Sequence, residues 1–199
     1  MGKMLLQEKV RSKHGMLNSD RKRGISAMPN WCKGNIRLRG KRKNIIDFLR
    51  HEISFVGTDL KTFDTVETCP NFREDDYEMI VSRPDKTEGL AFLSFYIHGT
   101  RRNFIDSKTI EYFFYCDEQD QTDVLCIDDF SAAWGIDPEP YIEKAVKYGI
   151  DIKIIGYEKG MMFRQEIEIV NGTLVKDETR EWKETNKWYW EAENTNYGG

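Results

Sequence analysis

The sequence predicts an α+β fold in which two helices pack on one face of an antiparallel sheet. Two observations lead to this prediction. Apolar and polar residues alternate with period two over 161–170, and the pair Asn171-Gly172, which favours a tight hairpin turn, follows at once. Two other segments, 41–54 and 138–148, carry their apolar residues at helical spacing. Helices with one apolar stripe and a sheet with one polar face bury their apolar sides against each other.

Residues 1–27 are predicted to form a basic N-terminal arm. They hold seven Lys and Arg residues against Glu8 and Asp20, a net charge of +5, and because the whole chain carries −4 the remainder carries −9. A solvated extension is the simpler interpretation of this arm, and an arm that contacts nucleic acid is the alternative.

The elements of the main domain, 28–177, follow from local patterns. Ile36 and Leu38 alternate with Arg37 and Arg39, which predicts a first strand with a basic outer face. The helix at 41–54 comes next.

Turn-forming residues are scattered through 55–88, which is therefore expected to be irregular. Strands are predicted at 90–98, 110–115 and 124–132, where β-forming residues are concentrated, and an acidic loop is predicted at 117–123.

The second helix has recognisable ends. Asp137 is placed to cap its start, Pro138 suits the first turn, and Gly149 ends it. Three antiparallel strands are then expected at 150–157, 161–170 and 173–177. The following residues are expected to share one core: Ile45, Phe48, Leu49, Ile142, Val146, Phe163 and Ile167. The Trp-rich tail, 178–199, is expected to dock on the body of the domain.

Two stretches carry motifs of a known family. One is Met28-Pro-Asn-Trp-Cys32 with Asn35, a strand, Gly40 and an amphipathic helix; the other is Phe130-Ser-Ala-Ala-Trp134 with the second helix and the closing hairpin. Together they resemble the phage and plasmid proteins with the YubB or Api92-like ferredoxin-like domain. The resemblance implies a ferredoxin-like core over 28–177, carried by a mobile genetic element and without an enzymatic site.

In both motifs a tryptophan stands beside a strand, so Trp31 and Trp134 are expected to be structural and largely buried. No phosphate loop, nucleophile elbow or His-Glu-x-x-His helix occurs. We therefore predict no catalytic residue. His98, with Asp106 and Glu111 nearby in sequence, is the nearest candidate for a base, but a lone histidine is usually structural.

No cofactor and no metal site are expected. The four cysteines and three histidines are scattered, and the acidic loop lacks the spacing and the glycine of a calcium-binding loop. No apolar run approaches the roughly 20 residues that a membrane-spanning helix needs. Reduced cysteines in a cytoplasmic protein are the simplest interpretation.

Two charged runs remain as candidate binding surfaces. An acidic run can imitate the phosphates of a nucleic acid and contact a basic partner surface; its members are Asp117, Glu118, Asp120, Asp123, Asp128 and Asp129. A basic run is the alternative, as a nucleic-acid surface; its members are Lys33, Arg37, Arg39, Lys41, Arg42 and Lys43. A sheet that binds RNA also needs exposed aromatic residues, and Ile36 and Leu38 provide none.

We therefore expect a non-enzymatic phage protein that binds a host protein or ribonucleoprotein complex in the bacterial cytoplasm. Inhibition of a host defence system such as CRISPR-Cas, through the acidic run, is the leading hypothesis. An RNA- or DNA-binding module that uses the basic first strand and the arm is the alternative from another class. A metal-dependent nuclease is a third and weaker one.

Overall fold

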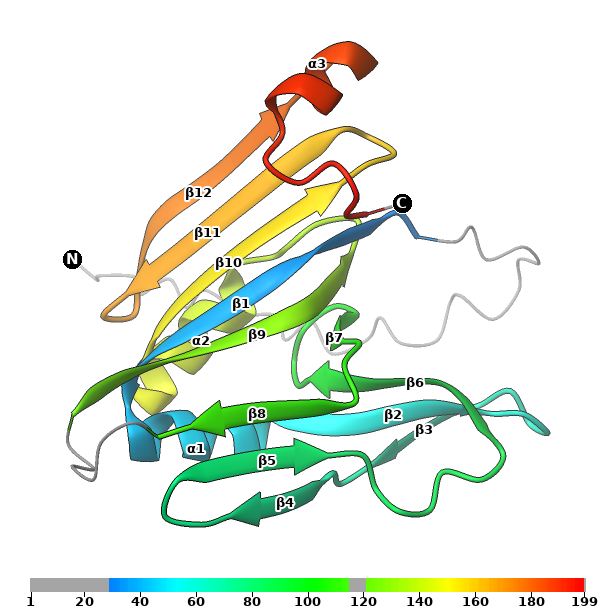
Figure 1. Cartoon of the computed structure of the whole chain (residues 1–199), viewed down its shortest axis with the longest axis vertical. Coiled ribbons are helices and arrows are strands. Elements are labelled where there is room, and N and C mark those ends of the chain that lie inside the picture. Colours follow the sequence, from blue (N-terminus) through cyan, green and yellow to red (C-terminus); the bar gives the residue numbers. More distant parts are fainter. Residues whose placement is uncertain (1–28, 115–120, 199) are drawn as a thin grey trace, which may run out of the picture.

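The computed structural model describes residues 29–114 and 121–198, in which the chain forms twelve strands and three short helices (Figure 1). The predicted arm, 1–27, lies outside the described residues. The strands are β1 (Trp31–Lys41), β2 (Ile53–Asp59), β3 (Thr65–Thr68), β4 (Asn71–Glu74), β5 (Glu78–Ser82), β6 (Leu90–Ile97), β7 (Asn103–Ile105), β8 (Thr109–Phe113), β9 (Thr122–Ala133), β10 (Asp151–Glu158), β11 (Phe163–Val170) and β12 (Thr173–Glu181). The helices are α1 (Arg42–Glu52), α2 (Glu139–Tyr148) and α3 (Thr185–Glu191).

Nine of these strands form one large antiparallel sheet. Its order is β12-β11-β10-β1-β9-β7-β6-β2-β3, and β4, β5 and β8 form a separate three-stranded sheet. The predicted ferredoxin-like α+β fold is therefore wrong, because the described chain is mostly β and its helices are few and short. The difference arises between α1 and α2, where β2, β3, β6, β7 and β9 extend the sheet well beyond a small ferredoxin-like core and β4, β5 and β8 form the second sheet.

The segment 55–88, which was expected to be irregular, contains most of β2 and all of β3, β4 and β5. Its turn residues separate strands of only four or five residues from β3 to β5. The sequences of β3 (Thr-Val-Glu-Thr) and β5 (Glu-Met-Ile-Val-Ser) do not alternate strictly between apolar and polar residues, although their burial alternates, and β3 forms one edge of the large sheet. The turn-forming residues were therefore identified correctly, but they form short connections between strands instead of a long loop.

The hairpin between β11 and β12 is confirmed. Asn171 and Gly172 have φ angles of 50° and 70°, the left-handed values that a type I′ turn requires at both central residues. The end of α2 is also confirmed, since Gly149 caps it with a φ of 60°. At its start, the backbone N–H of Glu139 donates to Asp137 Oδ1 at 3.1 Å.

The face of the large sheet that contacts α1 and α2 is called the inner face below, and the opposite one the outer face. Ile45, Phe48, Leu49 and Ile167 are fully buried in one core on the inner face, and Ile142 and Phe163 pack against it. Val146, expected in this core, is 66% exposed, because it lies at the margin of α2 over the β11–β12 turn, against Gly172.

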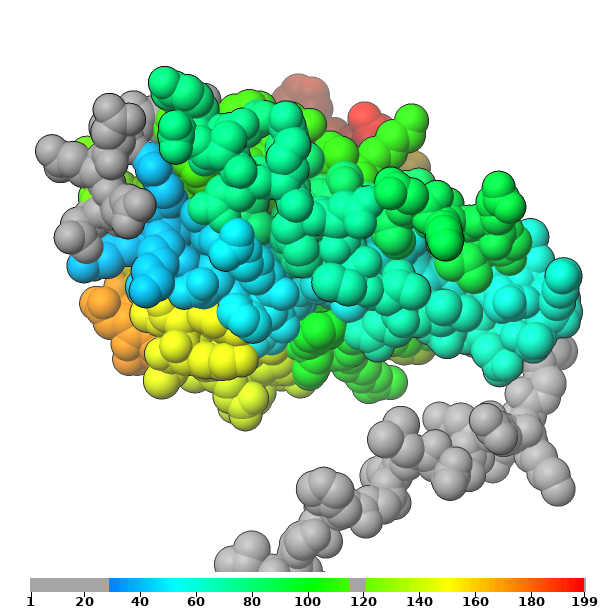
Figure 2. Space-filling model, turned by 90° about the horizontal axis from the view of Figure 1, so that it is seen from below, coloured from blue at the N-terminus to red at the C-terminus, as the bar shows by residue number. Residues whose placement is uncertain are grey.

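The three-stranded sheet adds to the same core. Met79 and Val81 of β5 and Tyr112 of β8 are buried in the cluster that contains the residues of α1. Arg50 of α1 forms an ion pair with Glu74 of β4. Figure 2 shows this side of the molecule, where α1 (blue) lies between the surfaces of α2 (yellow) and of the small sheet (blue-green).

The C-terminal segment covers part of the outer face. Trp182 and Trp188 are buried against Tyr157 of β10, and Ile155 packs beside them. In Figure 1 this segment (red) crosses in front of β11 and β10, whereas α2 lies behind β1 and β9. Within residues 29–114 and 121–198, the C-terminal segment leaves the outer face over β1, β9, β7, β6, β2 and β3 uncovered.

Candidate functional site

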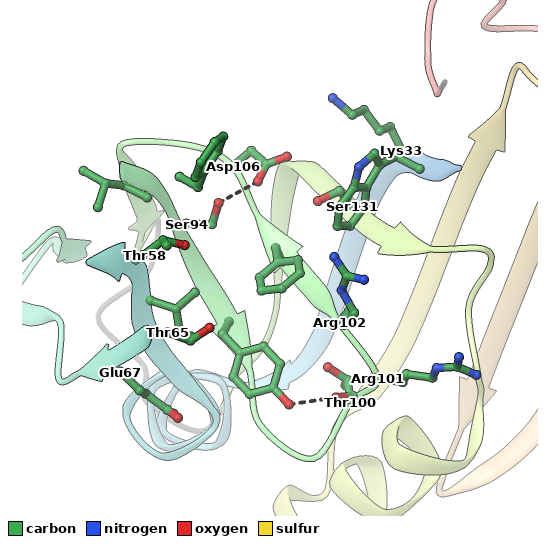
Figure 3. A pocket seen from close by; sticks show the side chains of 17 residues that line it. Lys33, Thr58, Thr65, Glu67, Ser94, Thr100, Arg101, Arg102, Asp106 and Ser131 are labelled. Carbon is green, nitrogen blue, oxygen red and sulfur yellow. Dashed lines mark hydrogen bonds between the residues drawn. The ribbon is translucent and has the colours of Figure 1, made fainter. Parts of the chain in front are cut away.

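The outer face is hollowed into a groove of about 1030 Å³, which we call the outer-face groove (Figure 3). Six strands of the large sheet and the turn between β6 and β7 supply its lining. The residues that line it are Trp31, Lys33, Val56, Gly57, Thr58, Thr65, Glu67, Phe92, Leu93, Ser94, Tyr96, Thr100, Arg101, Arg102, Phe104, Asp106 and Ser131.

Strand alternation decides which side chains face the groove. In β6 the buried Phe95 and Ile97 point to the inner core, so Ser94 and Tyr96 point outward. Phe104 of β7 pairs with Tyr96 and therefore lies on the same face. The sheet thus has aromatic residues on both faces: some are buried in the inner core and others face outward.

Three aromatic rings form a row along the floor of the groove. The ring centroid of Trp31 lies 5.9 Å from that of Phe104, and the centroid of Phe104 lies 5.7 Å from that of Tyr96. All three side chains are partly exposed. The Tyr96 hydroxyl donates to the carbonyl oxygen of Thr100 at 2.7 Å, and burial raises the pKa of Tyr96, so the phenol stays neutral. Such a row offers planar apolar surface to a ligand that carries rings of its own.

Cationic groups line one wall of the groove. The guanidinium carbon of Arg102 lies 5.5 Å from the centre of the Trp31 ring and 5.6 Å from that of Trp134, within cation–π range of both. The guanidinium of Arg101 lies 5.2 Å from the Trp134 ring. Figure 3 shows both arginines and Lys33 on the same side of the groove.

The opposite wall carries a carboxylate. Glu67 of β3 lies there in Figure 3, and its Oε1 is 3.0 Å from Nε2 of His98. The other ring nitrogen of His98 is 3.0 Å from the carbonyl oxygen of His51. Nearer the cationic wall, Ser94 Oγ donates to Asp106 Oδ1 at 2.9 Å. The groove therefore joins an aromatic floor to a cationic wall and a wall of hydroxyl and carboxylate groups.

A β-bulge adds an aromatic residue at the rim. The pairing of β2 with β6 shifts between Val56 and Thr58, and Phe92 has a φ of 51° and is 85% exposed. Gly57 makes room for the bulge, because a Cβ there would lie 2.9 Å from Leu93 Cδ2. Bulges commonly redirect a side chain next to a functional site.

The structure divides the predicted basic run between two places. Lys33, Arg37 and Arg39 alternate with buried residues and lie on the outer face of β1. Only Lys33 lines the groove, and Arg39 pairs with Asp151 at 2.7 Å. Lys41 ends β1, whereas Arg42 and Lys43 belong to α1; the Arg42 guanidinium lies over the Phe114 ring.

The predicted acidic run is described only in part, because Asp117, Glu118 and Asp120 lie outside the described residues. Asp123 faces inward, where it accepts a hydrogen bond from the Tyr112 hydroxyl at 2.9 Å. Asp128 has the opposite parity in β9 and is exposed, and Asp129 occupies a strand irregularity with a φ of 58°. These three carboxylates do not share one face of the strand.

The two tryptophans predicted to be structural contact the cationic wall. Trp31 is partly exposed and lines the groove, and Trp134 is 48% exposed, so its predicted burial is wrong. The reason is local: β9 ends at Ala133, and Trp134 follows in a turn with a φ of 64°.

Sequence reasoning missed Tyr96, Phe104, Arg101 and Arg102. An Arg-Arg pair in a turn between two aromatic-rich segments was the available signal. Whether this pair belongs to a binding site depends on which face of the sheet the aromatic residues occupy and on which strands lie next to them. Both depend on the sheet order.

The described part of the chain holds no group of three or more His, Cys, Asp or Glu side chains arranged to bind a metal ion. None of its helices has the length and apolar character needed to cross a membrane. Searches with protein-family models, curated proteins and solved structures gave no match to this chain.

Proposed function

We propose that this protein binds single-stranded nucleic acid in the outer-face groove. The observation that carries the proposal is the row of Trp31, Phe104 and Tyr96 beside the cations Lys33, Arg101 and Arg102. Aromatic rings on a sheet stack with unpaired bases, and nearby cations contact the phosphates that join them. The exposed aromatic residues that the sequence did not indicate are thus present on this face.

The shape of the groove favours a single strand over a duplex. In a duplex the bases are stacked on one another and are reached only by their edges, so a row of rings has nothing to stack against. A groove of about 1030 Å³ lies at the upper end of the range typical of small-ligand pockets, about 300–1,000 Å³. An extended ligand of several nucleotides fits this space.

The negative net charge of the chain, −4, limits how tightly phosphates are attracted overall. Stacking on the groove floor therefore contributes most of the affinity, and the three cations contribute the electrostatic part. Dissociation constants in the micromolar range are expected at physiological salt, since few phosphates are neutralised.

Fluorescence anisotropy with labelled oligonucleotides of about 12 nucleotides tests this proposal, since OB folds that bind single strands cover about 4–16 nucleotides. The full chain is titrated into single-stranded RNA, single-stranded DNA and the matching duplex. Binding of at least one single strand in clear preference to the duplex supports the proposal.

A pair of aromatic variants locates the site. Tyr96→Ala removes a ring from the floor, whereas Tyr189→Ala removes a ring that is 54% exposed in α3, away from the groove. Tyr96→Ala should weaken binding and Tyr189→Ala should not. Equal effects of the two variants, or no binding to any single strand, would show that the groove is no nucleic-acid site.

Inhibition of a host defence system such as CRISPR-Cas, in the cytoplasm of a bacterial host, stays a prediction, and so does the mobile-element origin. Capture of single-stranded nucleic acid is an activity that such an inhibitor can use. The same oligonucleotides, incubated with divalent cations and analysed for cleavage, test the nuclease alternative.

A further inference from the structure

Two guanidinium groups contact one tryptophan ring at the end of the cationic wall. Arg101 and Arg102 both lie over the Trp134 ring, and Arg102 also lies over Trp31. Trp134 and Arg101 also line a second cavity of about 460 Å³, so the cluster forms the ridge between that cavity and the groove. We call Arg101, Arg102 and Trp134 the arginine cluster.

No carboxylate of residues 29–114 or 121–198 lies within ion-pair distance of either guanidinium. Two like charges held on one ring repel each other, and the rings compensate only in part. A bound anion removes this repulsion. Within the described part of the chain, the cluster therefore offers two unneutralised positive charges to an anionic ligand.

The backbone at the cluster is strained. Arg102 has a φ of 57°, in the left-handed region that a long side chain rarely adopts. The turn from Gly99 to Arg102 holds this conformation, with the Thr100 hydroxyl donating to the Ile97 carbonyl oxygen at 2.6 Å. Strain of this kind is concentrated at ligand-binding positions, where it fixes a side chain in advance.

We propose that the arginine cluster binds the terminal phosphate of the nucleic-acid strand, an inference that rests on the proposed function of the groove. An internal phosphodiester carries one negative charge, whereas a terminal phosphate monoester carries about −1.5 to −2 and has three free oxygens. Two planar guanidinium groups match the second better, since each can donate two parallel hydrogen bonds to phosphate oxygens. The strand then ends at the cluster and its bases run along the row of rings.

The test compares oligonucleotides of one sequence that differ only at their ends. One carries a 5′-phosphate, one a 3′-phosphate and one only hydroxyl groups, and a phosphoserine peptide forms a fourth arm. One of the two phosphorylated strands should bind about tenfold more tightly than the unphosphorylated one, which corresponds to about 1.4 kcal/mol. The preferred end gives the direction of the strand in the groove.

Variants tie this preference to the cluster. Arg102→Gln and Arg101→Gln should each abolish the preference while retaining some binding of the unphosphorylated strand. Arg37→Gln removes an exposed cation of the same face that does not line the groove, and the preference should survive it. Thermal melts of each variant show whether it is folded. Because two arginines are tested separately, the test can still be made if one variant misfolds.

The outcomes separate the two proposals. Equal binding of all three strands overturns the terminal-phosphate site and leaves the groove function standing. Binding of none of them overturns the groove function and, with it, this inference. Preferential binding of the phosphopeptide overturns the assignment to a nucleic-acid end.

Discussion

Trp31 and Phe104 lie in strands β1 and β7, far apart in the sequence, yet their ring centroids are 5.9 Å apart in an edge-to-face arrangement. Strand β9 lies between these two strands, and its Ser131 pairs with both Lys33 and Phe104. The contact therefore depends on the sheet order and on outward-facing positions in both strands. It joins the aromatic floor of the groove to its cationic wall.

Phe104→Ala should weaken the binding of single-stranded nucleic acid about 5- to 150-fold, because a stacked base contributes about 1–3 kcal/mol. Fluorescence anisotropy with the labelled strand measures the change. Phe63→Ala is the matched control, because Phe63 is 78% exposed in the β2–β3 turn and does not line the groove. A loss of affinity no larger than that of the control contradicts a stacking role for Phe104.

The salt dependence of binding should be shallow. Each phosphate neutralised on a single strand contributes about −0.7 to the slope of log K against log salt, so three cations predict a slope of about −2. Lys33→Gln should make this slope less steep by about 0.7. Lys43→Gln, which changes an exposed lysine of α1, should leave it unaltered. A steep slope that responds to Lys43 would place the phosphates on another surface.

The ionic cluster at Glu166 should make the folded state sensitive to acid. Burial alone would raise the pKa of Glu166, but hydrogen bonds from Lys153, Lys176 and Arg164 outweigh it and lower the pKa from 4.5 to about 2. Because the folded pKa is the lower one, the stabilisation is complete above pH 4.5 and is lost as the pH falls toward 2. Denaturant unfolding at a series of pH values measures this.

Glu166→Gln should lower the free energy of unfolding by about 3 kcal/mol at neutral pH, because it leaves three cations beside an uncharged amide. It should also flatten the acid dependence between pH 4.5 and 2. Glu178→Gln is the control, since Glu178 is exposed and contacts Lys176 at 3.2 Å. Similar pH profiles for the two variants would show that Glu166 is not the group responsible.

Gly34→Ala should be among the most destabilising single changes in β1, costing about 3 kcal/mol or more. A Cβ at Gly34 would lie 1.8 Å from the backbone carbonyl oxygen of Ile155, so strands β1 and β10 would have to separate. Gly40→Ala is the comparison, because its Cβ would lie closest to the side-chain methyl group Cγ2 of Ile150, at 2.9 Å, and no nearer than 3.5 Å to any backbone atom. Equal melting temperatures for the two variants contradict this account.

The sequence by itself determined the features that depend on neighbouring residues. The left-handed turn at Asn171-Gly172, the capping of α2 by Gly149 and the apolar stripes of both main helices are local, because a few consecutive residues supply their energetic preference. The alternation in β1 likewise placed Arg37 and Arg39 on one face.

Only the tertiary structure decided the sheet order, and with it the groove. Short strands such as β3 and β4 are edge strands that each pair with a single neighbour, β2 and β5 respectively, and four residues do not reveal them. Trp31, Tyr96 and Phe104 meet because β1, β9, β7 and β6 are neighbours, and which strands pair is fixed by long-range hydrogen bonds and burial of the inner core. Alternate residues of these strands are buried in the inner core. The aromatic residues of the groove occupy the positions between them, so they face outward and stay partly exposed.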